Sequence, residues 1–354
     1  MAQIRVGARP EHDPEGRGKG GEVREHRERE GGGGEGETLH QGEEAGGCGG
    51  RLWQAGARIP EDAEGRYDTS MCPLAPALLA ALLPLAASGA PPAEPVAFVV
   101  CAPGYPGSTA EAQPVMDALA AALADATGWG RGRVTAEYYE DEARGLERLA
   151  RADAAFALVP LAFFLKHEAA LQLAAEAQVV AEGGRAEETW SLVAGKGRVS
   201  RPQALDGWEI LTSVGYAPRF VRGTALGGWG GAPPGAKVVA SGTVLSGLRR
   251  AAAGERVALL LDSVEAAALP TLPFAKDLDV VTRSAPVPAT VVCAVKKRAS
   301  AAQVEEAVQA LFDLRRRSSG AAALSAMRTE GFVPLDQQSL DRARAAYAAA
   351  KEAP

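Results

Sequence analysis

Hydroxyl groups gather in residues 102–113, a loop that follows an apolar run and precedes a predicted helix. Tyr105, Ser108 and Thr109 lie there, and Pro114 suits the first turn of the helix. Backbone N–H groups and the dipole at a helix N-terminus favour an anion. The pattern therefore fits an anion-binding loop, although a capped helix without a ligand explains the same residues more simply.

Other kinds of chemistry find little support. The four cysteines show no CxxC and no metal-ligand spacing, and three of the four histidines precede residue 71. We therefore expect neither a metal nor a cofactor. The net charge is −6 and no basic stripe is present, which argues against a nucleic-acid surface. His167 falls on a predicted helix, as a solvated or packed residue.

The first ninety residues differ in composition from the rest. Residues 1–70 are rich in Gly, Glu and Arg, so we expect either a disordered segment or an extension that is not translated, with Met71 as the start. Residues 71–90 contain an apolar stretch that is too short to span a bilayer, followed by Ser88-Gly89-Ala90. We interpret this stretch as a signal peptide, which predicts a periplasmic protein.

The remaining chain alternates strands and helices, and is organised around residues 144–165. These predict a helix, a turn, a buried strand at 154–159 and a second helix. Leu146 and Leu149 share one helical face, with Arg148 off it. The pattern predicts two α/β lobes, with the chain crossing twice between them. Residues 91–188 form the first lobe, residues 189–288 form the second, and residues 289–354 return to the first.

Further elements are expected from apolar runs and turn residues. An extended run is predicted at 187–194, a short helix at 198–208, a plain connector at 227–235 and a loop at 331–334. The predicted strands are 96–101, 134–138, 177–181, 209–212, 236–240, 257–261, 278–282 and 289–295.

Four passages together resemble the phosphate/phosphite/phosphonate-binding proteins of bacterial ABC transporters. They are GLERLARADAAFALVPLAFF, ALDGWEI, VVTRSAPVPATVVCAVKKR and MRTEGFVPLDQQSLDRAR, and the resemblance covers about residues 95–350. It implies a type II periplasmic-binding-protein fold with a ligand cleft between two lobes. The positions that match the family's binding residues are Tyr105, Ser108, Thr109, Pro160, Phe163, Thr212, Ser213, Tyr216 and Asp262.

The resemblance implies a monomeric, non-catalytic protein that captures a small anion or polar solute and delivers it to a transporter permease. The mature chain is not expected to span the membrane. The chain departs from the family at Ser213-Val214-Gly215, where Ser-Thr-Ser is usual, and at Val244, where a His is common. Phe163 and Phe164 also lack a tyrosine hydroxyl, so fewer donors face a phosphonate.

Two alternatives remain open on the sequence. One is a sensor or accessory domain with the same fold, and the other is an enzyme. An enzyme site should contain a nucleophile–base pair or a perturbed carboxylate. The sequence offers Asp262 as the acid near the predicted cleft. Cys101 and Cys293 fall in predicted strands, and we favour buried free thiols over a disulfide.

Overall fold

The computed structural model describes residues 94–105 and 107–350, which belong to one compact unit of the chain. The predicted extension at 1–70 and the predicted signal peptide at 71–90 lie outside the described residues. Within the described part, no helix is both long enough and apolar enough to cross a membrane.

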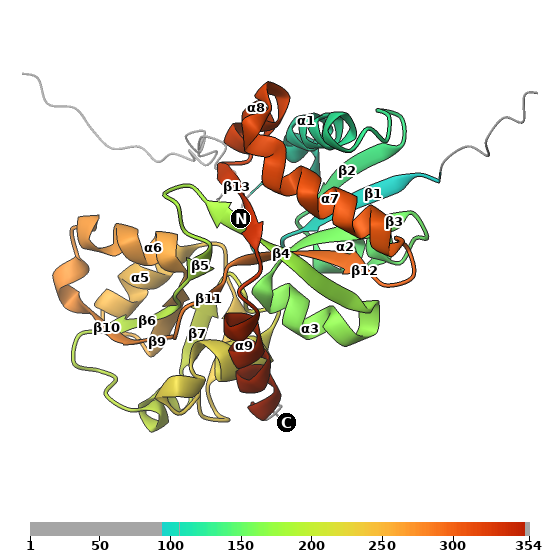
Figure 1. The fold of residues 1–354 in the computed structure, drawn as a ribbon. Coiled ribbons are helices and arrows are strands. Elements are labelled where there is room, and N and C mark those ends of the chain that lie inside the picture. The colour runs from blue at the N-terminus through green and yellow to red at the C-terminus, as the bar shows by residue number, and fades with distance from the viewer. Residues whose placement is uncertain (1–93, 106, 351–354) are drawn as a thin grey trace, which may run out of the picture. The chain divides into compact units, whose positions relative to one another are not determined.

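A six-stranded sheet forms the first lobe, in the order β13-β4-β12-β3-β1-β2 (Figure 1). β1 runs parallel to β2 and β3, whereas β12 is antiparallel to β3 and β4, and β13 is antiparallel to β4. The sheet is therefore mixed. Its strands are β1 Val96–Cys101, β2 Val134–Tyr139, β3 Ala154–Pro160, β4 Leu173–Ala181, β12 Thr290–Val295 and β13 Thr329–Pro334.

Helices cover both faces of this sheet, which explains why β1 and β3 are buried along their whole length. The first face packs against α1 Thr109–Thr127, α7 Ala301–Asp313 and α8 Ser318–Ala326. The opposite face packs against α2 Glu142–Leu149 and α3 Leu161–Leu171. The apolar residues of β1 and β3 therefore contribute to two hydrophobic cores, one on each face of the sheet.

A five-stranded sheet forms the second lobe, in the order β10-β6-β9-β7-β8. β7 is parallel to β8 and β9, while β6 is antiparallel to β9 and β10. Its strands are β6 Ser191–Gly195, β7 Glu209–Thr212, β8 Lys237–Ala240, β9 Val257–Leu261 and β10 Leu278–Arg283. Its helices are α4 Pro218–Phe220, α5 Val244–Ala252 and α6 Ser263–Ala268, with a π-helical turn at Val221–Ala225 after α4.

The chain passes between the sheets in two short strands that pair with each other. β5 Glu187–Glu188 is antiparallel to β11 Val287–Pro288. The last helix, α9 Gln337–Ala349, contacts both lobes. Arg344 Nη2 donates to Glu168 Oε1 of α3 at 2.6 Å, while Thr224 Oγ1 of the π-helical turn donates to the Ala343 carbonyl at 3.3 Å.

Three local predictions were wrong. The predicted loop at 331–334 belongs to β13, because its backbone pairs with β4 and Phe332 is buried opposite Val179. The predicted helix at 198–208 is reduced to a 3-10 turn at Pro202–Leu205. The predicted connector at 227–235 contains a second 3-10 turn, Gly227–Trp229.

Arg148 was expected off the buried face of its helix, and it is instead 5% exposed. Its Nε lies 2.8 Å from Glu137 Oε2, and its Nη2 lies 2.9 Å from Asp153 Oδ2. The guanidinium thus joins α2 to β2 and to the turn before β3. The hydrogen bond from Arg148 lowers the pKa of the Glu137 carboxyl.

Candidate functional site

The loop after β1 touches the turn after β7, so the two lobes meet at their strand ends. Gly104 has φ +82°, and a Cβ atom placed on it would overlap the carbonyl oxygen of Ser213. Only a glycine permits both this backbone conformation and this close approach. The lobes are therefore closed on each other at this point.

Tyr105 lies next to this contact, among groups from both lobes and from the crossing. Burial raises the pKa of its phenol well above the usual range, and the negative charges of Glu188 and Asp262 raise it further. Tyr216 and Glu265 act on Tyr105 in the same direction. The first loop, β5 and the start of α6 thus converge around one phenol.

Two hydroxyl groups of the second lobe are buried without a partner. Tyr216 Oη and Ser213 Oγ have no hydrogen-bond partner among the described residues. A buried unpaired polar group costs about 1–3 kcal/mol, so native proteins rarely keep one without a reason. Both hydroxyls follow β7, where the sequence resemblance places ligand contacts, and both are suited to bind a polar ligand.

Glu188 of β5 is a buried acid in the same neighbourhood. Its Oε1 accepts a hydrogen bond from Trp190 Nε1 at 3.0 Å. Burial raises the pKa of its carboxyl from 4.5 to about 8, and the negative charge of Asp262 adds to the shift. Glu188 is therefore mostly protonated at neutral pH, and can donate a hydrogen bond as well as accept one.

We expect replacement of Glu188 by Gln to reduce the pH dependence of stability. The unfolded carboxyl titrates near 4.5 and the folded one near 8. Its contribution is therefore fully present below the unfolded pKa and is lost as the pH rises through the folded pKa. Between pH 5 and pH 8.5, the difference in unfolding free energy between Glu188→Gln and wild type should change by about 4 kcal/mol in favour of the variant, since one pKa unit corresponds to about 1.4 kcal/mol. Equal differences in Tm between the two proteins at both pH values would contradict the assignment.

The predicted anion site at the start of α1 is filled by the chain's own carboxylates. Ser108 caps the helix in a reciprocal arrangement with Glu111. The backbone N–H and Oγ1 of Thr109 donate to Glu140 Oε2 at 2.9 and 2.6 Å. A ligand anion at this terminus would have to displace a carboxylate and bind beside another.

The other predicted site residues have structural partners. Phe163 is fully buried on α3, with its ring centroid 4.7 Å from that of His167. Pro160 is the buried last residue of β3. Thr212 Oγ1 accepts from the Val214 N–H at 3.4 Å. Asp262 Oδ1 caps α6, accepting from the N–H groups of Val264 and Glu265 at 2.8 and 2.7 Å.

Sequence reasoning missed Glu188 and Gly104 as site residues. A pair of acids, Glu187-Glu188, within an extended run was a usable signal for Glu188, because a strand points alternate residues to opposite faces. No local signal marks Gly104. Its role depends on the approach of Ser213, more than a hundred positions away in the sequence.

Two basic side chains near Tyr216 are engaged by the Glu142 carboxylate. Lys166 Nζ donates to the Tyr216 carbonyl at 2.7 Å and lies 2.8 Å from Glu142 Oε1. His167 Nε2 lies 2.7 Å from the same carboxylate oxygen.

The two cysteines in the described part of the chain form no disulfide. Cys101 and Cys293 are buried and free. Over the described residues, no cluster of three or more His, Cys, Asp or Glu side chains could hold a metal ion.

Solved structures share this fold. XAC2383 from Xanthomonas citri, bound to chloride ion, aligns with a TM-score of 0.54 at 17% identity, over 71% of this chain and 96% of that protein. The same protein bound to ATP gives a TM-score of 0.51 at 16% identity, with the same coverage.

A binding protein component of an ABC phosphonate transporter from Pseudomonas aeruginosa aligns with a TM-score of 0.50 at 15% identity, over 70% of this chain and 83% of that protein. No family model and no curated protein matches the sequence. The predicted two-lobed type II periplasmic-binding-protein fold is confirmed, and the predicted resemblance is confirmed as a likeness of fold.

Proposed function

We propose that this chain is an exported solute-binding protein that captures a small polar solute between its lobes for an ABC transporter. The observation that carries the proposal is the pair of buried, unpartnered hydroxyls of Tyr216 and Ser213, beside Tyr105 and the contact between the lobes. The transporter component from P. aeruginosa with this fold supports the transport role.

The charges around Tyr105 favour a solute that brings hydrogen-bond donors. The groups that raise the pKa of Tyr105 are the carboxyl groups of Glu188, Asp262 and Glu265 and the phenol of Tyr216. A phosphonate dianion placed there would be desolvated beside carboxyl groups, which is costly. A solute with hydroxyl or amino groups can instead donate to the acids and accept from the tyrosines.

The proposal extends to the organisation of the chain. The lobe boundaries are 91–188, 189–288 and 289–354, and residues 71–90 direct export to the periplasm. The mature protein acts as a monomer that hands its solute to a permease, without catalysing a reaction. Closure follows rotation of the lobes about the paired strands β5 and β11.

Native mass spectrometry of the full chain, exported from a bacterial host and purified gently, tests the function. A co-purifying small molecule would identify the solute class, and a phosphorus or sulfur oxyanion among such masses would overturn the preference for a donor-bearing solute. A protein that stays ligand-free against polyols, amines, phosphate, sulfate and alkylphosphonates would contradict solute capture and favour a sensor domain.

Replacing Tyr216 by Phe removes one unpartnered hydroxyl and keeps the ring. We expect the affinity for the co-purified solute to fall roughly 10- to 100-fold, because one hydrogen bond within a buried site is lost. Thermal stability without solute should not fall, since the hydroxyl has no partner there. Tyr139→Phe is the matched control, because that hydroxyl donates to Glu137 at 2.8 Å. Equal affinities of both variants would exclude Tyr216 from the site.

A further inference from the structure

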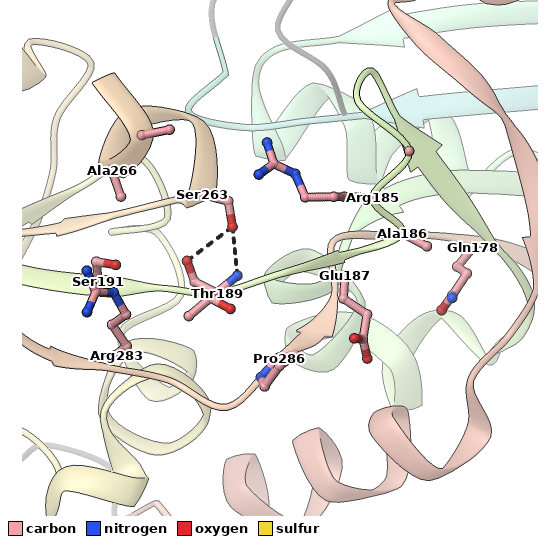
Figure 2. A pocket seen from close by; sticks show the side chains of 12 residues that line it. Gln178, Arg185, Ala186, Glu187, Thr189, Ser191, Ser263, Ala266, Arg283 and Pro286 are labelled. Carbon is pink, nitrogen blue, oxygen red and sulfur yellow. Dashed lines mark hydrogen bonds between the residues drawn. The ribbon is translucent and has the colours of Figure 1, made fainter. Parts of the chain in front are cut away.

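A concavity lies at the crossing between the lobes, and we call it the hinge groove. It has a volume of about 800 Å³, which is within the range of small-molecule sites. Figure 2 shows that its lining comes from both crossing segments and from α6. Arg185, Glu187 and Thr189 lie in or beside β5, Arg283 is the last residue of β10, and Pro286 precedes β11.

The hinge groove lies on the opposite face of β5 from the proposed solute site. Glu187 and Thr189 line the groove, whereas Glu188 lies beside Tyr105 and Asp262. Alternate residues of an extended segment point to opposite faces, so the two sites share the crossing strand but not its side chains. A ligand in the groove would therefore bind separately from the solute.

One wall of the groove is held in place by hydrogen bonds. Ser263 Oγ accepts from the Thr189 N–H at 2.8 Å and donates to the Thr189 carbonyl at 3.3 Å (Figure 2). These bonds tie the first turn of α6 to the first crossing segment. The groove is thus a preformed feature of the closed lobes.

The two arginines supply the binding chemistry. Neither guanidinium group, of Arg185 or of Arg283, has a hydrogen-bond or ion-pair partner among the described residues, and both residues are exposed at the groove. In Figure 2 the Arg185 side chain extends toward the Ser263 side, and Arg283 lies beside Ser191. Guanidinium groups bind carboxylate and phosphate oxygens in a bidentate manner. Glu187 also lines the groove. Its carboxylate offsets one of the two positive charges of the arginines, so the groove disfavours anions that carry little charge.

We propose that the hinge groove binds a small multivalent oxyanion, a polycarboxylate or a phosphate ester, through Arg185 and Arg283. Arg185 lies just before β5, and Arg283 ends β10 before β11, so a bound anion bridges the segments that lead into the two crossing strands. A second consequence rests on the proposed solute function. Rotation that opens the lobes at Gly104 and Ser213 must move the two crossings, and an anion that bridges them favours the closed arrangement.

Isothermal titration of the full chain with citrate and with pyrophosphate, at fixed ionic strength, tests the proposal. We expect saturable binding of at least one probe, weakened about tenfold or more in the Arg185→Gln/Arg283→Gln double variant. Arg249→Gln is the control, since that arginine is exposed on α5 and does not line the groove. Binding of citrate alone would identify a polycarboxylate site, and binding of pyrophosphate alone a phosphate site.

Absence of saturable binding at millimolar concentrations, or equal binding by the double variant, would overturn the proposal. The titration does not use the transported solute. Its result therefore tests the anion site even if the proposed solute-binding function is wrong. Hydrogen exchange tests the coupling separately. With the bound probe, amides at 102–105 and 213–217 should exchange more slowly in wild type but not in the double variant. Unchanged exchange in wild type would separate the anion site from lobe closure.

Discussion

Gly104→Ala is expected to weaken solute binding by about two orders of magnitude, equal to roughly 2.7 kcal/mol. The added Cβ overlaps the Ser213 carbonyl when the lobes are closed, and this backbone atom cannot move aside alone. The variant must separate the lobes to relieve the overlap. The apparent dissociation constant then rises as the closed fraction falls. Titration with the co-purified solute measures the effect.

Gly130→Ala is a closely matched control for this substitution. Gly130 has φ +83°, nearly the same as the +82° of Gly104, but a Cβ there meets nothing within 4 Å. Both variants carry the same left-handed backbone strain, about 1–2 kcal/mol. The control should lose stability but keep its affinity, and amides at 213–217 should exchange faster only in Gly104→Ala. A shared loss of affinity would show that the contact between the lobes is irrelevant to binding.

Arg148→Met is expected to lower the stability of the first lobe by about 3 kcal/mol. The change keeps an apolar stem but leaves Glu137 and Asp153 facing each other without a cation, and loss of one partner of a buried pair is strongly destabilising. Both carboxylates are about one-third exposed, so solvent limits the cost. Chemical denaturation followed by circular dichroism measures it.

Arg131→Met tests whether burial causes this effect. Arg131 pairs with Asp125 at 3.1 Å, but its side chain is 75% exposed. Exposed pairs contribute little, so the denaturation midpoint should hardly move.

The effect of Arg148→Met should also depend on pH. Because Arg148 lowers the pKa of Glu137, the stability that Arg148 contributes through Glu137 is present above the unfolded pKa of 4.5 and is lost as the pH falls. Arg148→Met should therefore differ least from wild type in acid.

Continuous apolar runs located the central strands well. β1, β3 and β9 are buried along their whole length, and the sequence shows each as an unbroken apolar segment. β13 was missed because its pairing partner, β4, lies about 150 residues earlier and no local pattern records that pairing. The extended run at 187–194 also divides between two sheets, which depends on tertiary pairing.

The candidate site was predictable in part. Tyr105, Tyr216 and Ser213 were identified by the family resemblance, and the structure brings them to the meeting of the lobes. Thr109 is bonded instead to Glu140, which is 31 positions away, and sequence spacing could not reveal that partner. Arg148 was misplaced because helical periodicity does not report the carboxylates that make its burial favourable.

The position of β12 fixes when the centre of the first-lobe sheet can form during synthesis. β3 and β4 are consecutive along the chain, but β12 lies between them in the sheet. Both strands therefore keep an open edge until Thr290–Val295 has been made, after the whole second lobe. Domains generally fold as they emerge, N-terminal first, yet this sheet must wait for a late strand. If export begins before β12 has been synthesised, the chain is translocated while its first lobe is still incomplete.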